Sequence, residues 1–416
     1  MNVVVIGAGL AGLVSAIRLR QAGADVTLVT KGIGGLQLSQ GTIDVLGYTP
    51  ERVERPFEAI ESYAAEHPAH PYATLGAESV RTGVDYLREL VGPDLLEGDG
   101  TTNYQLPTAL GAIRPTAVAQ PSMVEGNVAD GAQVVIVGPR ELKDFYPGLI
   151  ADNLSRTPLP GGGSISARGA SFSLPARPGE VDSTGLSYAR ALDSAAYRAS
   201  FAAAVAPLVR GNETVGLPAI LGINDPTAWR DVAERIGRPV FEIPLPPPGV
   251  PGMRLNQKLT QIAKDARVRY ILGAEVTGAT TSGDAVTGLT IEVAGGVREL
   301  QADAVVVATG GFESGALELD SYGTVRETAL GLPLVGADDP DLIHGDFWGK
   351  QQPLFAVGVG VDQDCRVLDG ADPKYSNLYA AGGILAGAVR WHDKCGEGVA
   401  LGSAVRAADA ILEGQR

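Results

Sequence analysis

A glycine-rich turn near the N-terminus is the feature that most constrains the fold of this chain. Residues 3–6 form an apolar run, a helical pattern occupies residues 10–21, and a second apolar run spans residues 26–30. Between the first run and the helix lies the pattern G-x-G-x-x-G, formed by Gly7, Gly9 and Gly12. The first glycine permits a tight turn, the second lets a phosphate approach the backbone, and the third lets helix and strand pack closely. The sequence therefore predicts a Rossmann-like nucleotide site, with phosphate at the helix N-terminus.

Length, charge and cysteine content limit the class of protein further. With 416 residues, 45% of them hydrophobic, the chain is long enough for two domains with sizeable cores. The formal net charge of −15 argues against binding nucleic acid or anionic lipid through bulk electrostatics. The two cysteines, Cys365 and Cys395, are too few for a disulfide framework or a four-thiolate iron–sulfur site. We expect a reducing compartment and no metal site, because no His/Cys cluster has metal-ligand spacing.

Changes of pattern along the chain predict its domain organisation. Residues 1–54 and 253–416 are expected to form one nucleotide-binding domain that is split in sequence. Residues 55–252 are expected to form an inserted domain that caps the substrate or contacts a partner, and the Pro-rich segment 246–252 marks its end. The predicted fold class is α/β, a Rossmann-like domain with an inserted α+β domain.

Two further strands run into glycine-rich segments after the insertion. The apolar run 304–308 ends in one segment, the strand 378–381 ends in another, and an Ala-rich helix begins near residue 398. A helix N-terminus aimed at the pyrimidine edge of a flavin would stabilise negative charge on the reduced ring. The residues expected to approach a cofactor here are Thr309, Gly310, Gly382, Gly383, Gly396 and Gly398.

Segments along almost the whole chain carry a family resemblance. The glycine turn, the strand-rich run into VVATGG and the closing glycine-rich helix resemble the flavoprotein class that includes fumarate reductase flavoprotein subunits. A closer resemblance, to the B subunit of the anaerobic glycerol-3-phosphate dehydrogenase, is carried by LSQGTIDVLGY, AHPYATLG, LPPPGVPGMRLNQKL, ATGGFESGAL, HGDFW and NLYAAGGILAG…CGEGVALGSA. These segments run from residue 1 to about residue 411.

The resemblance implies an electron-transferring flavoprotein subunit. In that family's complex, the A subunit is the FAD-containing dehydrogenase, the B subunit is assigned a flavin, and the C subunit holds iron–sulfur centres and meets the membrane and quinone. The implied reaction converts sn-glycerol 3-phosphate to dihydroxyacetone phosphate. The implied location is cytoplasmic, peripheral at the inner face of the cell membrane through the two partner subunits. Within LSQGTIDVL, the resemblance adds Ser39 and Gly41 to the cofactor-binding residues.

The end of the second strand bears on which flavin is bound. A carboxylate there normally holds the adenosine ribose hydroxyls, whereas this chain has Thr30 and Lys31. FMN has no adenosine ribose, so the missing acid fits FMN, and under this hypothesis Lys31 meets the terminal phosphate. Gly383 also stands where many FAD enzymes have an acid. The G-x-G-x-x-G pattern, in contrast, is typical of pyrophosphate sites and favours FAD. Both flavins stay open, with FMN slightly favoured.

Oxidation of an alcohol by the chain itself needs a base for the hydroxyl proton and a cationic handle for the phosphate. His392, just ahead of the C-terminal helix, is the best placed of the four histidines. Arg254 in GMRLNQKL is the candidate phosphate or substrate contact. The structural alternatives are a surface histidine and a surface ion pair.

Two other functions remain open from the sequence. One is a stand-alone FAD oxidoreductase of the fumarate-reductase type, which the lack of a convincing Arg/His cluster for a dicarboxylate disfavours. The other is a scaffold without catalytic activity of its own, and the missing ribose acid is its best support.

Overall fold

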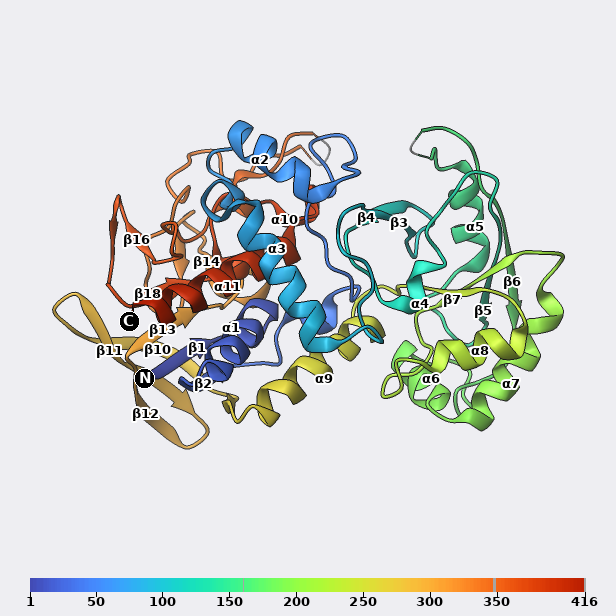
Figure 1. Ribbon diagram of the computed structural model, residues 1–416, viewed down its shortest axis with the longest axis horizontal. Helices are drawn as coiled ribbons and strands as arrows, with labels where there is room; N and C mark the ends of the chain where they lie inside the picture. Colours follow the sequence, from blue (N-terminus) through green and yellow to red (C-terminus); the bar gives the residue numbers. More distant parts are fainter. Residues whose placement is uncertain (160, 347–348, 415–416) are drawn as a thin grey trace.

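Two lobes lie side by side along the long axis of the molecule, with the N-terminus in the lobe at the left of Figure 1. The computed structural model describes residues 1–159, 161–346 and 349–414. Phe347 and Trp348 of the HGDFW segment therefore lie outside the described residues. The chain builds the first part of the left lobe, crosses to the right lobe for its middle third, and then returns to complete the left lobe.

The first lobe is built on a five-stranded parallel sheet with the order β18-β13-β1-β2-β9. Its strands are β1 (Asn2–Ile6), β2 (Asp25–Thr30), β9 (Arg269–Leu272), β13 (Ala304–Val307) and β18 (Leu378–Ala380). Val3 to Ile6 of β1 and all four residues of β13 are apolar and buried, because parallel sheets are covered on both faces. This sheet confirms the Rossmann-like architecture predicted from the glycine turn.

Helices cover this sheet and bring the two ends of the chain together. They are α1 (Leu10–Gln21), α2 (Pro56–Glu66), α3 (Pro71–Val91), α9 (Val250–Asp265), α10 (Arg390–Asp393) and α11 (Gly396–Glu413). The N-terminal helix α1 packs against the C-terminal helix α11, which in turn packs along α3. An ion pair joins the first two helices, because Arg18 donates to both carboxylate oxygens of Asp409 at 2.7 and 2.8 Å.

Short strands and 3₁₀ turns complete the first lobe. An antiparallel sheet of β10 (Glu275–Ser282), β11 (Ala285–Val293) and β12 (Gly296–Gln301) flanks the parallel sheet. Smaller elements are η1 (Gly35–Leu38), η3 (Phe312–Ser314), β14 (Leu317–Leu319), β15 (Val325–Glu327), η4 (Pro353–Ala356), β16 (Leu368–Asp369), β17 (Asp372–Pro373) and η5 (Gly382–Ile384).

The second lobe has its own sheet and core. Its elements are β3 (Tyr104–Pro107), β4 (Ile113–Thr116), α4 (Pro121–Val124), β5 (Gln133–Pro139), α5 (Pro147–Arg156), β6 (Ser166–Phe172), α6 (Gly185–Leu192), α7 (Ala195–Val205), η2 (Ala206–Leu208), β7 (Thr214–Pro218), α8 (Ala228–Ile236) and β8 (Val240–Ile243). The main sheet has the order β6-β5-β7-β8 and is parallel throughout. The insertion thus combines an α/β sheet with one antiparallel hairpin, β3–β4.

Residues after 55, which the sequence analysis assigned to the insertion, pack in the core of the first lobe. Phe57 and Ile60 of α2, and Val80 and Leu87 of α3, belong to the same hydrophobic core as β1 and α1. Their apolar faces have the helical spacing that the sequence showed, but that spacing does not say which lobe they cover. We propose that the second lobe begins near residue 104 and ends near residue 250.

No helix in the described ranges of the chain has the length and apolarity needed to cross a membrane.

Candidate cofactor site

The glycine turn at residues 7–12, here called the phosphate turn, lies at the carboxyl end of β1. Gly7 has a φ of +107°, and a Cβ atom there would overlap the carbonyl oxygen of Ala308. A Cβ atom at Gly12 would overlap the carbonyl oxygen of Gly7, whereas a Cβ atom at Gly9 would meet no protein atom within 4 Å. The turn therefore requires Gly7 and Gly12 for its own packing, while the face at Gly9 is open to a ligand.

The N-terminus of α1 begins at this open face. Gly9 is the N-cap residue, no side chain caps the helix, and no acidic residue lies in the first turn. The first N–H groups of a helix have no partner within the helix and carry a partial positive charge. These groups are therefore available to a phosphate, as the motif predicts.

The second predicted glycine segment reaches the phosphate turn. Ala308, directly after β13, touches Gly7, and the amide of Ala308 donates to the carbonyl of Ile6 at 2.8 Å. The hydroxyl of Thr309 is buried, and among the described residues it has no hydrogen-bond partner. A buried hydroxyl without a partner is costly, and a ligand oxygen beside the phosphate turn would satisfy it. The open turn, the uncapped helix and this hydroxyl fit a phosphate-bearing cofactor.

The third predicted segment approaches α1 from the other side. A Cβ atom at Gly382 would lie 2.8 Å from the Cβ of Ala11, in the first turn of α1. The guanidinium of Arg390 lies so close to Gly383 that any side chain at residue 383 would overlap it. Arg390 also donates to Glu313 at 2.8 Å. The guanidinium of Arg390 thus occupies the space where many FAD enzymes have an acid.

Packing against protein explains several other predicted cofactor residues. Gly41 lies against Pro251 and Gln120, and Ser39 accepts a hydrogen bond from the amide of Gly41 at 3.2 Å. Gly398 lies against the hydroxyl of Tyr72. The need for glycine at residues 41 and 398 follows from these contacts, and cofactor contacts of Ser39, Gly41, Gly310, Gly396 and Gly398 stay predictions.

Lys31 stands at the exposed rim of the site. Its ammonium lies 2.9 Å from Glu275 at the start of β10, and 75% of its side chain is exposed. The carboxylate therefore already neutralises the charge that the FMN hypothesis assigned to a terminal phosphate.

A buried cluster of charged residues, here called the acid cluster, lies beside the N-terminus of α11. Arg114 donates to both carboxylate oxygens of Asp44, at 2.7 and 2.5 Å, and to the hydroxyl of Thr42 at 2.7 Å. The hydroxyl of Thr116 donates to Asp44 at 2.6 Å. The second carboxylate is Glu397, which accepts from the amide of Asp44 at 3.3 Å. Two carboxylates thus share one arginine.

The acid cluster contains two carboxylates and one arginine, and this imbalance of charge favours the protonated form of one carboxyl group. Burial, together with the charge of Asp44, raises the pKa of Glu397 to about 7, and Arg114 opposes this shift only in part. Asp44 keeps the close ion pair, so Glu397 is the member that takes up a proton near neutral pH. The sequence analysis missed these residues, although Asp44 and Glu397 are lone acids in otherwise apolar, glycine-rich segments.

A second buried cluster joins His70, Asp393 and Cys395, whose possible ligand atoms all lie within 4.8 Å of one another. No local pattern in the sequence indicates this grouping, because His70 and Cys395 are 325 residues apart. The Nδ1 atom of His70 accepts from the amide of Tyr72 at 3.1 Å, so the neutral ring carries its proton on Nε2, 3.6 Å from the Cys395 sulfur. Burial lowers the pKa of His70 to about 4. A metal at Nε2 would require the opposite tautomer, so the geometry favours a hydrogen-bonded cluster.

The two residues predicted to be catalytic lie in different surroundings. His392 is half exposed and its Nδ1 lies 2.8 Å from Asp393, so its role as a base stays a prediction. Arg254 is buried in α9, and its guanidinium donates to both oxygens of Glu242 at 2.6 and 3.0 Å. The remaining donors bind Gly222 and Gln120, at 2.8 and 3.0 Å. These donors are therefore used in contacts between the lobes, and a role of Arg254 as a substrate contact stays a prediction.

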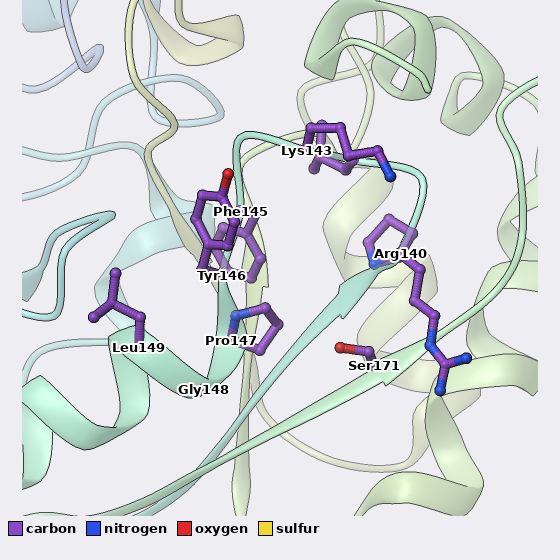
Figure 2. Close-up of a pocket in the computed structure, with 10 residues that line it drawn as sticks. Arg140, Lys143, Phe145, Tyr146, Pro147, Gly148, Leu149 and Ser171 are labelled. Atoms are coloured by element: carbon purple, nitrogen blue, oxygen red, sulfur yellow. The ribbon is translucent and has the colours of Figure 1, made fainter. Parts of the chain in front are cut away.

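One cavity lies away from the phosphate turn. Figure 2 shows this cavity, of about 480 Å³, in the second lobe, where Arg140, Lys143 and Tyr146 lie in the connection from β5 to α5. Its lining comes entirely from the second lobe and includes no residue of the glycine segments.

The fold and the phosphate turn define a class that comparison with known proteins supports. Residues 2–399 match the family described as "FAD binding domain". A dinucleotide turn at the carboxyl edge of a parallel sheet, within this family, defines an FAD-binding oxidoreductase. The preference for FMN gains no support, and the cofactor is a flavin of the FAD type.

Two curated relatives make the family more specific. A probable B subunit of anaerobic glycerol-3-phosphate dehydrogenase from Halobacterium salinarum is 32% identical over 430 residues, which cover 99% of this chain and 98% of the relative. The corresponding B subunit of Pectobacterium carotovorum is 30% identical over 431 residues, with the same coverage. This chain belongs to the B-subunit family of the anaerobic glycerol-3-phosphate dehydrogenases, as its sequence resemblance predicted.

Among solved structures, the 3-ketosteroid delta1-dehydrogenase from Sterolibacterium denitrificans is 12% identical, covers 99% of both chains and has a TM-score of 0.47.

Proposed function

We propose that this chain is the flavoprotein subunit of a quinone-linked sn-glycerol-3-phosphate dehydrogenase complex. The reaction takes glycerol 3-phosphate to dihydroxyacetone phosphate, and electrons pass through an iron–sulfur subunit to quinone. The observation that carries this proposal is the meeting of two glycine-ended strands and the open phosphate turn, in a chain of the B-subunit family.

The chain's own residues would hold the flavin from three sides. The N-terminus of α1 and the open face at Gly9 bind its phosphates, the hydroxyl of Thr309 donates to a ligand oxygen, and Arg390 lies over the third segment. A bound flavin would supply the acceptor for the hydride of the alcohol, which carries both electrons of the oxidation.

The reaction also needs a group that takes up the hydroxyl proton and a route by which electrons leave the flavin. Glu397, with its pKa near 7, is a group able to exchange the hydroxyl proton at neutral pH. Both cysteines are buried, and two thiolates cannot hold an iron–sulfur cluster of the usual kind. Electrons therefore leave through a partner, for which we propose the iron–sulfur C subunit, with the FAD-containing A subunit of the dehydrogenase as the second partner. Attachment to the inner face of the membrane would come through these subunits.

The decisive experiment uses the purified chain. Its visible spectrum is recorded, the cofactor is released by acid and identified by chromatography, and glycerol 3-phosphate is added without oxygen, before and after addition of the A subunit. We expect FAD, and reduction by glycerol 3-phosphate that is faster once the A subunit is present. Reduction at full rate by the chain alone would favour a stand-alone oxidoreductase, and a colourless chain would favour a scaffold.

A substitution at the open glycine tests the phosphate turn directly. Gly9→Ala adds a methyl group that meets no protein atom but projects into the phosphate position. We expect unchanged thermal unfolding and a loss of flavin affinity of at least about tenfold, because the phosphate can no longer approach the backbone. Gly148→Ala, also open to solvent, is the matched control and should keep its flavin. Full flavin content in Gly9→Ala would contradict this site.

A further inference from the structure

A cavity of about 400 Å³ lies between the two lobes. The first lobe contributes Gln37 and Gln257, the second lobe contributes Arg190 and Asn224, and apolar side chains complete the lining. Pockets for small ligands have volumes of this order, and in this cavity polar groups contribute more of the lining surface than apolar groups.

The charge of the lining is opposite to that of the chain. The whole chain has a formal net charge of −15, yet the lining contains one cation, Arg190, and no carboxylate. Amide groups of Gln37, Asn224 and Gln257 supply the remaining polar atoms. A guanidinium among neutral amides and apolar carbon selects an anion with hydroxyl or oxygen groups beside it.

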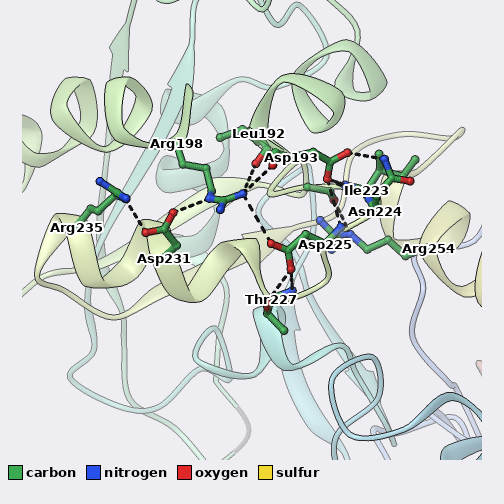
Figure 3. A network of polar contacts seen from close by, with 11 residues as sticks. Leu192, Asp193, Arg198, Ile223, Asn224, Asp225, Thr227, Asp231, Arg235 and Arg254 are labelled. Atoms are coloured by element: carbon green, nitrogen blue, oxygen red, sulfur yellow. Dashed lines mark hydrogen bonds and ion pairs between the residues drawn. The ribbon is translucent and has the colours of Figure 1, made fainter. Parts of the chain in front are cut away.

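The acid nearest in sequence to Arg190 is held elsewhere. Asp193 accepts hydrogen bonds from the amides of Ile223 and Asn224, at 2.9 and 3.0 Å, and from the Asn224 side chain at 2.7 Å (Figure 3). These bonds fix the loop that carries Asn224 as one wall of the cavity. In the part of the chain that the structure describes, Arg190 forms no ion pair, whereas Arg198 on the next helix pairs with both Asp225 and Asp231.

The cavity is also near the phosphate turn. Gln37 lies in η1, three residues after Gly34, and a Cβ atom at Gly34 would overlap the backbone of Ala8 in the turn. Three residues of extended chain span at most about 10 Å. The wall formed by Gln37 is therefore within reach of a cofactor whose phosphates lie at Gly9.

We propose that this inter-lobe cavity is a binding site for a small phosphate ester, with Arg190 as its charged contact. This assignment rests on the proposed function, and it identifies the subsite that binds the phosphate group of glycerol 3-phosphate. Arg190 binds the phosphate dianion, and the amides of Asn224 and Gln257 bind its oxygens or the adjoining hydroxyl. Arg190 thus takes the role that the sequence suggested for Arg254, whose guanidinium already makes four hydrogen bonds within the protein.

Binding to the purified full chain tests this assignment by calorimetry, with glycerol 3-phosphate, inorganic phosphate and glycerol as probes. We expect glycerol 3-phosphate to bind at least about tenfold more weakly to Arg190→Gln than to the unaltered chain, because a charge-assisted bond to phosphate is lost. Arg190→Lys should recover part of the affinity. Arg238→Gln, an exposed arginine of the same lobe, is the matched control, and thermal unfolding confirms that each variant is folded.

Three outcomes would overturn the proposal: equal affinity of Arg190→Gln and the unaltered chain, equal affinity for glycerol and glycerol 3-phosphate, or no binding of either phosphate compound. Failure of the dehydrogenase function can be distinguished from failure of the Arg190 subsite. If glycerol 3-phosphate binds through Arg190 but never reduces a flavin in the presence of the A subunit, the subsite stands and the dehydrogenase role falls. If reduction occurs and Arg190→Gln leaves both affinity and rate unchanged, only the subsite falls.

Discussion

Two buried arginines in this chain have opposite surroundings. Arg254 faces one carboxylate, Glu242, which also accepts from the Ser122 hydroxyl at 2.6 Å and from the Leu221 amide at 2.7 Å. Arg114 faces two carboxylates, Asp44 and Glu397, of which only Asp44 forms a direct ion pair. The first site is electrically balanced and the second carries one acid too many.

The difference separates a structural site from a chemical one. A balanced buried pair with its hydrogen bonds made fixes the geometry between the lobes. A buried cluster with an excess carboxylate holds a proton that can leave at physiological pH. The acid cluster, beside the N-terminus of α11, is thus the better candidate for chemistry, although the sequence had pointed to Arg254.

The largest effect is expected from breaking the balanced pair. Arg254→Ala leaves Glu242 buried without its cation, so we expect a loss of about 3–5 kcal/mol in the free energy of unfolding, measured by urea denaturation. The double variant Arg254→Met, Glu242→Leu removes both charges and should recover most of that loss. A single variant as stable as the unaltered chain would show that the pair does not hold the lobes together.

A smaller, pH-dependent effect is expected from the acid cluster. The pKa of Glu397 is raised from 4.5 to about 7 in the folded chain, so its contribution to stability is present below pH 4.5 and is lost as the pH rises through 7. Relative to Glu397→Gln, the unaltered chain should lose on the order of 1–3 kcal/mol between these pH values.

The measurement compares urea denaturation of the two chains at each pH, because His70, with its pKa lowered to about 4, contributes in the opposite sense in both. His70 stabilises the fold above about pH 6.5, and that stability is lost as the pH falls through 4. Glu313→Gln, which removes an exposed carboxylate paired with Arg390, is the control. Parallel stability curves for the unaltered chain and Glu397→Gln would place the excess proton elsewhere.

The smallest effect is expected at the exposed rim. Lys31 and Glu275 form a surface ion pair, and such pairs contribute about 0–1 kcal/mol. Lys31→Ala should therefore change the midpoint of urea denaturation very little and leave the flavin content of the purified chain unchanged. A clear loss of flavin would restore the role in phosphate binding that the sequence had suggested for this lysine.

The parts of the fold that were predictable are those with local signals. Two apolar runs, in β1 and β13, predict strands that are buried on both faces of a sheet. The spacing of Gly7, Gly9 and Gly12 predicts a turn in which backbone atoms approach closely. Each of these patterns lies within a few residues of sequence. The resemblance of several segments to one family added the cofactor class.

The buried charged clusters and the start of the second lobe could not be predicted, because they depend on contacts between residues far apart in the sequence. Arg114 and Asp44 are 70 residues apart, and Asp44 and Glu397 are 353 residues apart, so no local pattern joins them. The amphipathic faces of α2 and α3 predicted helices but not the lobe that they cover. Arg254 has the residue type of a phosphate contact, and no local pattern shows that its guanidinium binds Glu242 and Gly222 of the other lobe.

The return of the chain to the first lobe at α9 has a mechanical consequence. A Cβ atom at Gly252 would overlap the carbonyl oxygen of Leu36, and Gly41 lies directly against Pro251. Residues 251–252, where the chain returns to the first lobe, thus pack without a gap on residues 36–41, which include Gln37 of the inter-lobe cavity. A movement of the second lobe would therefore also displace η1 and the wall of the cavity that Gln37 forms.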